Sequence, residues 1–206
     1  MTELFISAFV TLFVVIDPPG CAPIYASLTS SASAAHRRAM AVRAVGIAAV
    51  ILLIFALWGK QLLGILGIAL DSFRIAGGIM LFMIAMDMVF EKRTQRREDR
   101  AQQISAEAPP VEDVSVFPMA MPMIAGPGSI ATVMLLMSRA QGLPERMVVM
   151  AAVALTLIIM LGALLAAGPL MTLLGKKIEA VITRLLGVLL AALAAQFVID
   201  GLRASF

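Results

Sequence analysis

The chain has 206 residues, of which 61% are hydrophobic and 14% charged, and its mean hydropathy is +1.00. A soluble domain of this size needs far more polar residues on its surface, so the composition excludes a soluble globular protein and indicates an integral membrane protein. The net charge of +3 predicts no nucleic-acid partner, since basic residues in membrane proteins mostly set topology. One histidine and one cysteine predict no metal site and no disulfide framework, and we expect no cofactor. The apolar runs are too long for the alternating strands of a membrane barrel, so we expect an all-α polytopic membrane protein in the lipid bilayer.

Six apolar stretches are long enough to cross a membrane. A bilayer core of about 30 Å needs roughly 20 apolar residues in a helix. The spans that we expect are 4–28, 39–59, 73–90, 117–138, 147–172 and 181–202.

The distribution of lysine and arginine predicts the orientation. Most of the 16 basic residues fall in one set of predicted loops: Arg37, Arg38, Arg43, Lys92, Arg93, Arg96, Arg97, Arg100, Lys176, Lys177 and Arg184. Cytoplasmic loops carry the excess of basic residues, so this set should face the cytoplasm. The sequence therefore predicts a multi-pass protein of the cytoplasmic (inner) membrane with both termini outside, in the periplasm.

A charged connection divides the chain into two halves. Residues 91–116 are dense in charge over most of their length and contain Pro109-Pro110, which predicts a cytoplasmic loop. The first half, 1–90, and the second half, 117–206, would each hold three spans. Binding of anionic lipid by the loop is an alternative to a plain connection between the halves.

The two halves share short motifs at nearly constant spacing. Pro19-Gly20 corresponds to Pro127-Gly128, Leu62-Leu63-Gly64 to Leu173-Leu174-Gly175, and Arg74-x-x-Gly77 to Arg184-x-x-Gly187, at spacings of 108, 111 and 110 residues. A repeat unit of three spans has an odd number of crossings, so its two copies must have opposite orientations. We therefore expect two inverted three-helix repeats, with the first and fourth helices broken at mid-membrane.

The first break is Asp17-Pro18-Pro19-Gly20, followed by Cys21. Proline cannot continue a helix, so the helix from residue 4 should end near Ile16. Aspartate at an N-cap, followed by proline at the first helical position, favours the start of a new half-helix. Asp17 is also the only acidic residue placed deep in a span, which makes it the candidate for proton coupling.

The second break contains Pro122, Gly126, Pro127, Gly128 and Ser129. Each break frees backbone N–H and C=O groups that lipid cannot satisfy. A half-helix N-terminus is partly positive and suits a carboxylate. The sequence therefore predicts a substrate site, with no catalytic residues, at Asp17, Pro18, Pro19, Gly20 and Cys21 together with these five residues. Kinks that serve helix packing are the alternative.

At these residues the chain resembles the MarC family of bacterial and archaeal inner-membrane proteins, which includes the SnatA small-neutral-amino-acid transporters. The resemblance runs nearly end to end and rests on Asp17-Pro-Pro-Gly20 with Pro23, Phe73-Arg-Ile-Ala-Gly-Gly78, Pro118-Met-Ala-Met-Pro122-Met-Ile-Ala-Gly-Pro-Gly128, Arg184-Leu-Leu-Gly187 and Gln196-Phe-Val-Ile-Asp200-Gly201. It implies six spans in two inverted repeats and periplasmic termini. Its transport members imply proton-linked movement of glycine, alanine and similar amino acids at the two unwound loops. This chain departs from the family at Cys21, where an asparagine is usual.

The function that we expect is secondary transport of a small zwitterionic solute, with small neutral amino acids such as glycine and alanine as the partners implied by the resemblance. A membrane-embedded accessory subunit is the alternative. An intramembrane aspartyl protease needs two close carboxylates, and Asp87 lacks a suitable motif to pair with Asp17, so we expect no enzyme. The sequence leaves a homo-oligomer open.

Overall fold

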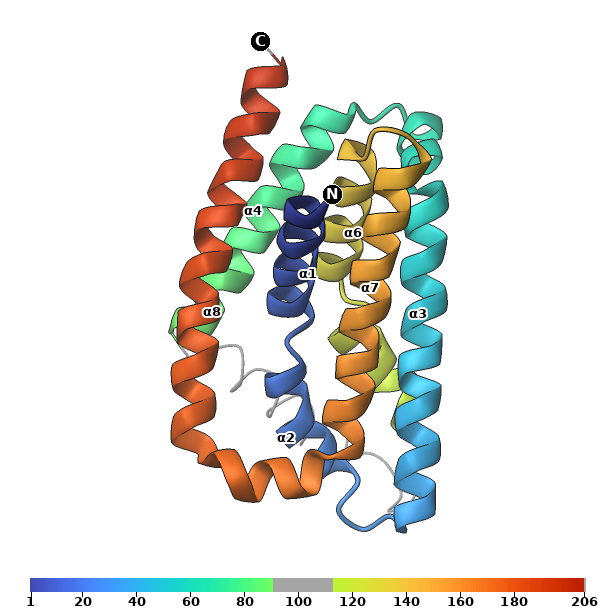
Figure 1. Ribbon diagram of the computed structural model, residues 1–206, viewed down its shortest axis with the longest axis vertical. Coiled ribbons are helices and arrows are strands. Elements are labelled where there is room, and N and C mark those ends of the chain that lie inside the picture. Colours follow the sequence, from blue (N-terminus) through green and yellow to red (C-terminus); the bar gives the residue numbers. More distant parts are fainter. Residues whose placement is uncertain (91–112, 206) are drawn as a thin grey trace.

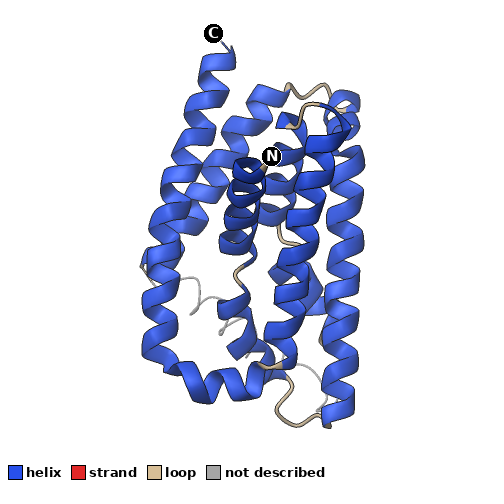
Figure 2. Ribbon diagram, in the orientation of Figure 1, coloured by secondary structure: helices blue, strands red, loops and turns tan. Residues whose placement is uncertain are grey.

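A computed structural model describes residues 1–90 and 113–205, without the side chains of 169–180. The predicted charged loop over 91–116 therefore lies outside the described residues, apart from 113–116. Throughout the described part the regular structure is helical, with short connections (Figure 2). The elements are α1 (Thr2–Ile16), α2 (Pro18–Leu28), α3 (Ala34–Ile65), α4 (Leu70–Val89), η1 (Ser115–Ile124), α6 (Pro127–Arg139), α7 (Gly142–Leu165) and α8 (Ala167–Ser205).

The all-α polytopic class is confirmed. Five segments of the described chain are long and apolar enough to cross a membrane, and α1 with α2 counts as one of them. The segment η1 with α6 forms a sixth, bent by 52° at its break. Both termini lie toward the same end of the bundle, as an even number of crossings requires (Figure 1). The relation of the two halves as inverted repeats stays a prediction.

Several span boundaries differ from the prediction, and two of the differences have a clear local cause. The helix α3 begins before residue 39 because the Ser33 side chain caps it, accepting a hydrogen bond from the His36 N–H at 3.2 Å. The predicted span 147–172 ends earlier, since α7 stops at Leu165 and α8 starts at Ala167. Pro169 explains this division, because the first turn of a helix tolerates a residue without an N–H and the interior does not.

The helices α4 and α8 run antiparallel and approach closely at glycines. A Cβ atom on Gly78 of α4 would lie 2.9 Å from the Ala194 carbonyl oxygen of α8. One on Gly187 of α8 would lie 3.1 Å from the Ala85 carbonyl oxygen of α4, and Gly201 approaches the same helix. Small residues let helix backbones approach within van der Waals contact, which is the main attraction between helices in lipid. Gly78 and Gly187 thus permit close packing of α4 against α8.

Each broken span packs against helices from the other half of the chain. The first broken span, α1 and α2, contacts α7 and α8. The second, η1 and α6, contacts α3 and α4. The two halves are thus interlocked, and both breaks lie inside the bundle.

The apolar core surrounds the two broken spans. Leu12 and Ile16 of α1, Tyr25 of α2, and Met119 and Ile124 of η1 are almost completely buried in one cluster. The outer faces of α3, α4, α7 and α8 carry exposed large apolar side chains, among them Ile54, Phe82, Ile158 and Val188. Such an apolar exterior suits lipid and would be unfavourable in water.

Replacing Gly78 with alanine should lower the stability of the bundle. The added Cβ meets backbone atoms of α8, which cannot move aside as a flexible side chain could. We expect a loss of about 1–3 kcal/mol, the usual cost of overpacking, read as a lower midpoint of thermal unfolding in detergent by circular dichroism. The control is Gly46→Ala in α3, where a Cβ would meet nothing within 4 Å. An equal midpoint for the two variants would contradict the close contact.

Candidate functional site

The first break is made by a single residue in the left-handed conformation. Asp17 has φ 61° and ψ 64°, and within the described chain it is the only residue other than glycine with positive φ. Its N–H donates to the Phe13 carbonyl at 2.9 Å, which closes α1, and its carbonyl accepts from the Cys21 N–H at 3.0 Å, which opens α2. Aspartate tolerates this backbone better than most residues do. One residue therefore ends one helix and starts the next.

The Asp17 carboxylate caps α2 from inside the protein. It is almost fully buried, and its Oδ1 accepts a hydrogen bond from the Gly20 N–H at 3.2 Å. A Cβ on Gly20 would overlap this carboxylate, so glycine is required for the close approach. The predicted N-cap at Asp17 and the predicted first helical position at Pro18 are both confirmed.

Cys21 faces the carbonyl end of α1. Its sulfur lies 3.6 Å from the Ile16 carbonyl oxygen, with the thiol as donor. The side chain at position 21 thus reaches a carbonyl at the C-terminal end of α1, where carbonyls have no intrahelical partner. A thiol is a weak donor, so this chain holds that carbonyl less firmly than an amide side chain would.

The second break begins earlier than the sequence predicted. In η1 the backbone leaves helical angles at Phe117 and Met121, each directly before a proline, because proline restricts the residue that precedes it. The peptide bonds Phe117–Pro118 and Met121–Pro122 are cis. The irregular stretch therefore covers 115–126, and the prolines at 118 and 122 were the signal for it in the sequence.

The helix α6 starts as predicted, with Gly126 at the cap and Pro127 at the first helical position. The Gly126 carbonyl accepts from the Ile130 N–H at 3.0 Å. A Cβ on Gly126 would overlap the Pro122 carbonyl oxygen, so this turn also requires glycine. The buried Thr132 hydroxyl donates to the Gly128 carbonyl at 2.8 Å, a contact that no sequence motif predicts.

The two breaks lie against each other. A Cβ on Gly128, in the first turn of α6, would lie 3.5 Å from Cγ1 of Val15 in the last turn of α1. From this region α2 and α6 run toward opposite ends of the bundle, α2 downward and α6 upward in Figure 1. Their N-termini therefore face the same central region from opposite sides.

The ten predicted site residues lie at these two breaks, and their exposure to solvent differs. Seven are buried: Asp17, Pro18, Gly20, Cys21, Gly126, Gly128 and Ser129. Pro19 and Pro122 are partly exposed and Pro127 is exposed. A solute could reach the buried set only after the helices move.

The two half-helix N-termini differ in the donors that they offer. In α2, Pro18 and Pro19 have no N–H, and the Gly20 N–H is bonded to Asp17. In α6, Gly128 and Ser129 carry first-turn N–H groups, which have no partner within a helix. One end therefore presents a carboxylate and the other presents N–H donors.

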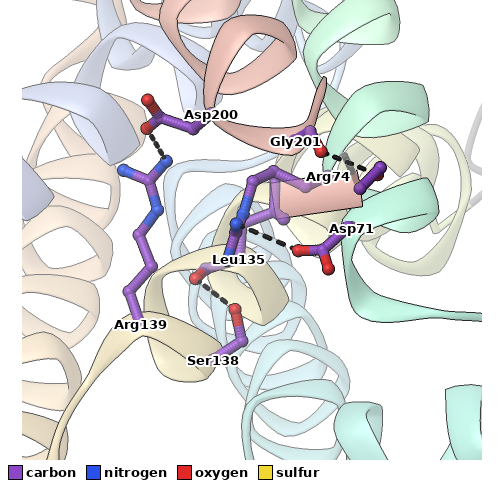
Figure 3. Close-up of polar contacts among 8 residues, drawn as sticks. Asp71, Arg74, Leu135, Ser138, Arg139, Asp200 and Gly201 are labelled. Atoms are coloured by element: carbon purple, nitrogen blue, oxygen red, sulfur yellow. Dashed lines mark hydrogen bonds and ion pairs between the residues drawn. The ribbon is translucent and has the colours of Figure 1, made fainter. Parts of the chain in front are cut away.

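Ion pairs lie at the end of the bundle where α6 terminates, and one of them links two helices (Figure 3). Arg139 of α6 pairs with Asp200 of α8 and lies over the Phe197 ring, 4.6 Å from its centroid. Arg74 pairs with Asp71 one turn earlier in α4, at 3.1 Å. Within the described chain no group of three or more histidine, cysteine or acidic side chains is arranged to hold a metal ion.

Comparison with known proteins decides the family. The profile described as "MarC family integral membrane protein" matches residues 2–206. The chain belongs to the MarC family.

Relatives in this family come from archaea and bacteria. A UPF0056 membrane protein of Methanocaldococcus jannaschii is 36% identical over 201 residues, covering 98% of this chain and 97% of the relative. The UPF0056 inner membrane protein YhgN of Escherichia coli is 34% identical over 205 residues, covering 98% of each. The UPF0056 membrane protein YhcE of the same organism is 33% identical over 198 residues, covering 96% and 91%. No solved structure matches this MarC family chain significantly.

Replacing Asp17 should separate its capping role from its charge. Asp17→Ala removes both the cap and a residue suited to positive φ, so we expect a loss of about 1–3 kcal/mol. Asp17→Asn keeps a capping oxygen and tolerates the same backbone, so it should lose less than half as much. Thermal unfolding in detergent, followed by circular dichroism, measures both. Equal losses for the two variants would show that the negative charge, and not the cap, stabilises the break.

Proposed function

We propose that this MarC family protein is a secondary transporter of a small zwitterionic solute, with glycine and alanine as the first substrates to test. The observation that carries the proposal is the meeting of two buried helix breaks of opposite chemistry. The Asp17 carboxylate lies at one break, and the N–H groups of Gly128 and Ser129 lie at the other. An amino acid carries the complementary pair of charges.

The binding mode follows from these groups. The solute carboxylate would accept hydrogen bonds from the first turn of α6, whose dipole favours negative charge. The ammonium group would lie toward Asp17 and the carbonyls at the end of α1, one of which Cys21 contacts. Glycines at 20, 126 and 128 let the surrounding groups approach the backbone closely, which favours a solute with a small side chain.

We further propose that the two halves are inverted repeats that rock against each other to alternate access. The packing of the broken spans supports this proposal, since the broken span of each half lies against helices of the other half. The first helical positions, Pro18 and Pro127, also match across the halves at a spacing of 109 residues. Proton uptake by Asp17 would weaken its contact with Gly20 and its attraction for an ammonium group. Movement of the proton would thereby be coupled to movement of the solute.

The orientation that we propose is the one predicted from the basic residues. The end of the bundle with Arg37, Arg38 and Arg43 would face the cytoplasm, and both termini would face the periplasm. The name of the relative YhgN supports the inner membrane as the location. We propose transport and not catalysis, because the described acidic residues form no close carboxylate pair at the breaks.

Counterflow of radiolabelled glycine and alanine in proteoliposomes tests the function. Vesicles preloaded with unlabelled amino acid should accumulate label when they contain the protein. Asp17→Asn should reduce the rate roughly tenfold or more, since a charge-assisted hydrogen bond to the ammonium is lost. Gly162→Ala is the control, because a Cβ there would meet nothing within 4 Å.

Three results of the transport measurements would count against the proposal or a part of it. Folded, reconstituted protein that gives no saturable flux of either amino acid above empty vesicles would contradict it. Flux that is unchanged by Asp17→Asn would remove Asp17 from the mechanism. Loss of function in cells without any flux in vesicles would favour the alternative of an accessory subunit.

A further inference from the structure

Two cavities of nearly equal size lie toward opposite ends of the bundle. The first, of about 200 Å³, lies where α2 ends, α3 begins and α7 ends. The second, of about 210 Å³, lies where α6 ends, α7 begins and α3 ends. We call them the α2 vestibule and the α6 vestibule. They are far from the residues that close the breaks, so neither is the central site itself.

The two vestibules are built from equivalent residues. Every pair that follows is 109 positions apart, the spacing of the two helix starts at Pro18 and Pro127. The pairs are Tyr25 and Met134, Thr29 and Ser138, Ala34 and Leu143, Arg37 and Arg146, Arg38 and Met147, Phe55 and Leu164, and Ala56 and Leu165. Unrelated packing gaps would not share one spacing in so many positions. The vestibules are therefore one feature present twice, once toward each end of the bundle, and each is lined by residues of both halves.

Each vestibule lies at the same distance from its break. Tyr25 is eight residues after the cap Asp17, and Met134 is eight residues after the cap Gly126. At about 1.5 Å per residue this is roughly 12 Å along each half-helix. The half-helices α2 and α6 thus lead from the central breaks to the two vestibules, one toward each end of the bundle.

The lining of both vestibules is cationic. Arg37 and Arg38 line the α2 vestibule, and Lys60 and Arg146 line the α6 vestibule. Among the described residues that line the two vestibules, none is aspartate or glutamate. Cations at a hollow with apolar walls raise the local concentration of anionic groups. The basic residues at the α6 vestibule lie on the predicted periplasmic side, where the positive-inside rule gives no reason for them.

A hydroxyl group lies beside the cations in each vestibule. The Thr29 hydroxyl donates to the Tyr25 carbonyl at 2.7 Å, and the Ser138 hydroxyl donates to the Leu135 carbonyl at 2.8 Å (Figure 3 shows the second). Each hydroxyl group therefore donates its hydrogen bond to a backbone carbonyl of its own helix and has no proton left for a solute. The cations are therefore the groups that distinguish an anion from a neutral solute here.

We propose that the two vestibules are the two mouths of one solute path, each an initial binding place for the carboxylate of the solute. Arg37 and Arg146 are the equivalent cations that receive it. This inference rests on the proposed transport function and adds the route and its recognition chemistry. The solute leaves either vestibule along α2 or α6 to reach the paired breaks.

Cysteine accessibility tests the vestibules without measuring transport. In a Cys21→Ser background, Thr29→Cys and Ser138→Cys place matched thiols in the two vestibules, and Ile158→Cys on the exposed apolar face of α7 is the control. Anionic and neutral methanethiosulfonate reagents of similar size are applied to reconstituted protein. We expect the anionic reagent to react about 3–10-fold faster than the neutral one at both vestibules, at low salt, and Ile158→Cys to show no such preference.

Removing single arginine charges tests whether Arg37 and Arg146 cause the faster reaction of the anionic reagent. Arg37→Gln should remove the preference at Thr29→Cys only, and Arg146→Gln should remove it at Ser138→Cys only. Arg43→Gln, at an exposed arginine of α3 outside the vestibule lining, is the control. Vestibule thiols that react no faster than Ile158→Cys, or a preference that survives both arginine changes, would overturn the proposal.

A transport measurement separates this inference from the proposed function. Arg37→Gln and Arg146→Gln should each raise KM for glycine several-fold from one side of the membrane, with kcat little changed. If wild-type protein transports glycine and neither variant changes KM from either side, the vestibules are not its entrances. If wild-type protein transports nothing, the proposed function fails while the cysteine rates still report the anion preference.

Discussion

The hydrogen-bonding demand of the backbone inside lipid is the constraint on which the rest of this structure depends. A helix that breaks at mid-membrane leaves N–H and C=O groups that hydrocarbon cannot satisfy. Here each break satisfies most of its own groups. Asp17 closes α1 with its N–H and opens α2 with its carbonyl and carboxylate, and Gly126 opens α6. The first-turn N–H groups of α6 and the last carbonyls of α1 are left by the helices themselves, and together with the Asp17 carboxylate they supply the binding chemistry that we propose.

The bundle protects these groups by interlocking its two halves. Each broken span lies against helices of the other half, while α4 and α8 form a close antiparallel contact through glycines. Lipid cannot drive helices together by the hydrophobic effect, so close packing of small residues has to supply the attraction. This arrangement places both breaks in the interior and joins them to both ends of the bundle, through α2 on one side and α6 on the other. A relative movement of the halves would therefore change access to both breaks at once.

Sequence and structure agree where a local rule governs the chain. Prolines at 18 and 127, with Asp17 and Gly126 before them, specified both half-helix starts to the residue, because a residue without an N–H fits only the first turn of a helix. The second break is longer than predicted, since the prediction began it at Pro122 and the backbone already becomes irregular before Pro118. The end of α7 was placed too late because hydropathy alone continued past Leu165.

The amino-acid sequence by itself determined the membrane class and the positions of the breaks. These follow from hydropathy and from the geometry of proline and glycine, which act over a few residues. Only the tertiary structure decided that the two breaks lie against each other, and that residues 109 positions apart line matched vestibules. Both outcomes depend on which groups meet across helices distant in the chain, and no local pattern encodes such meetings.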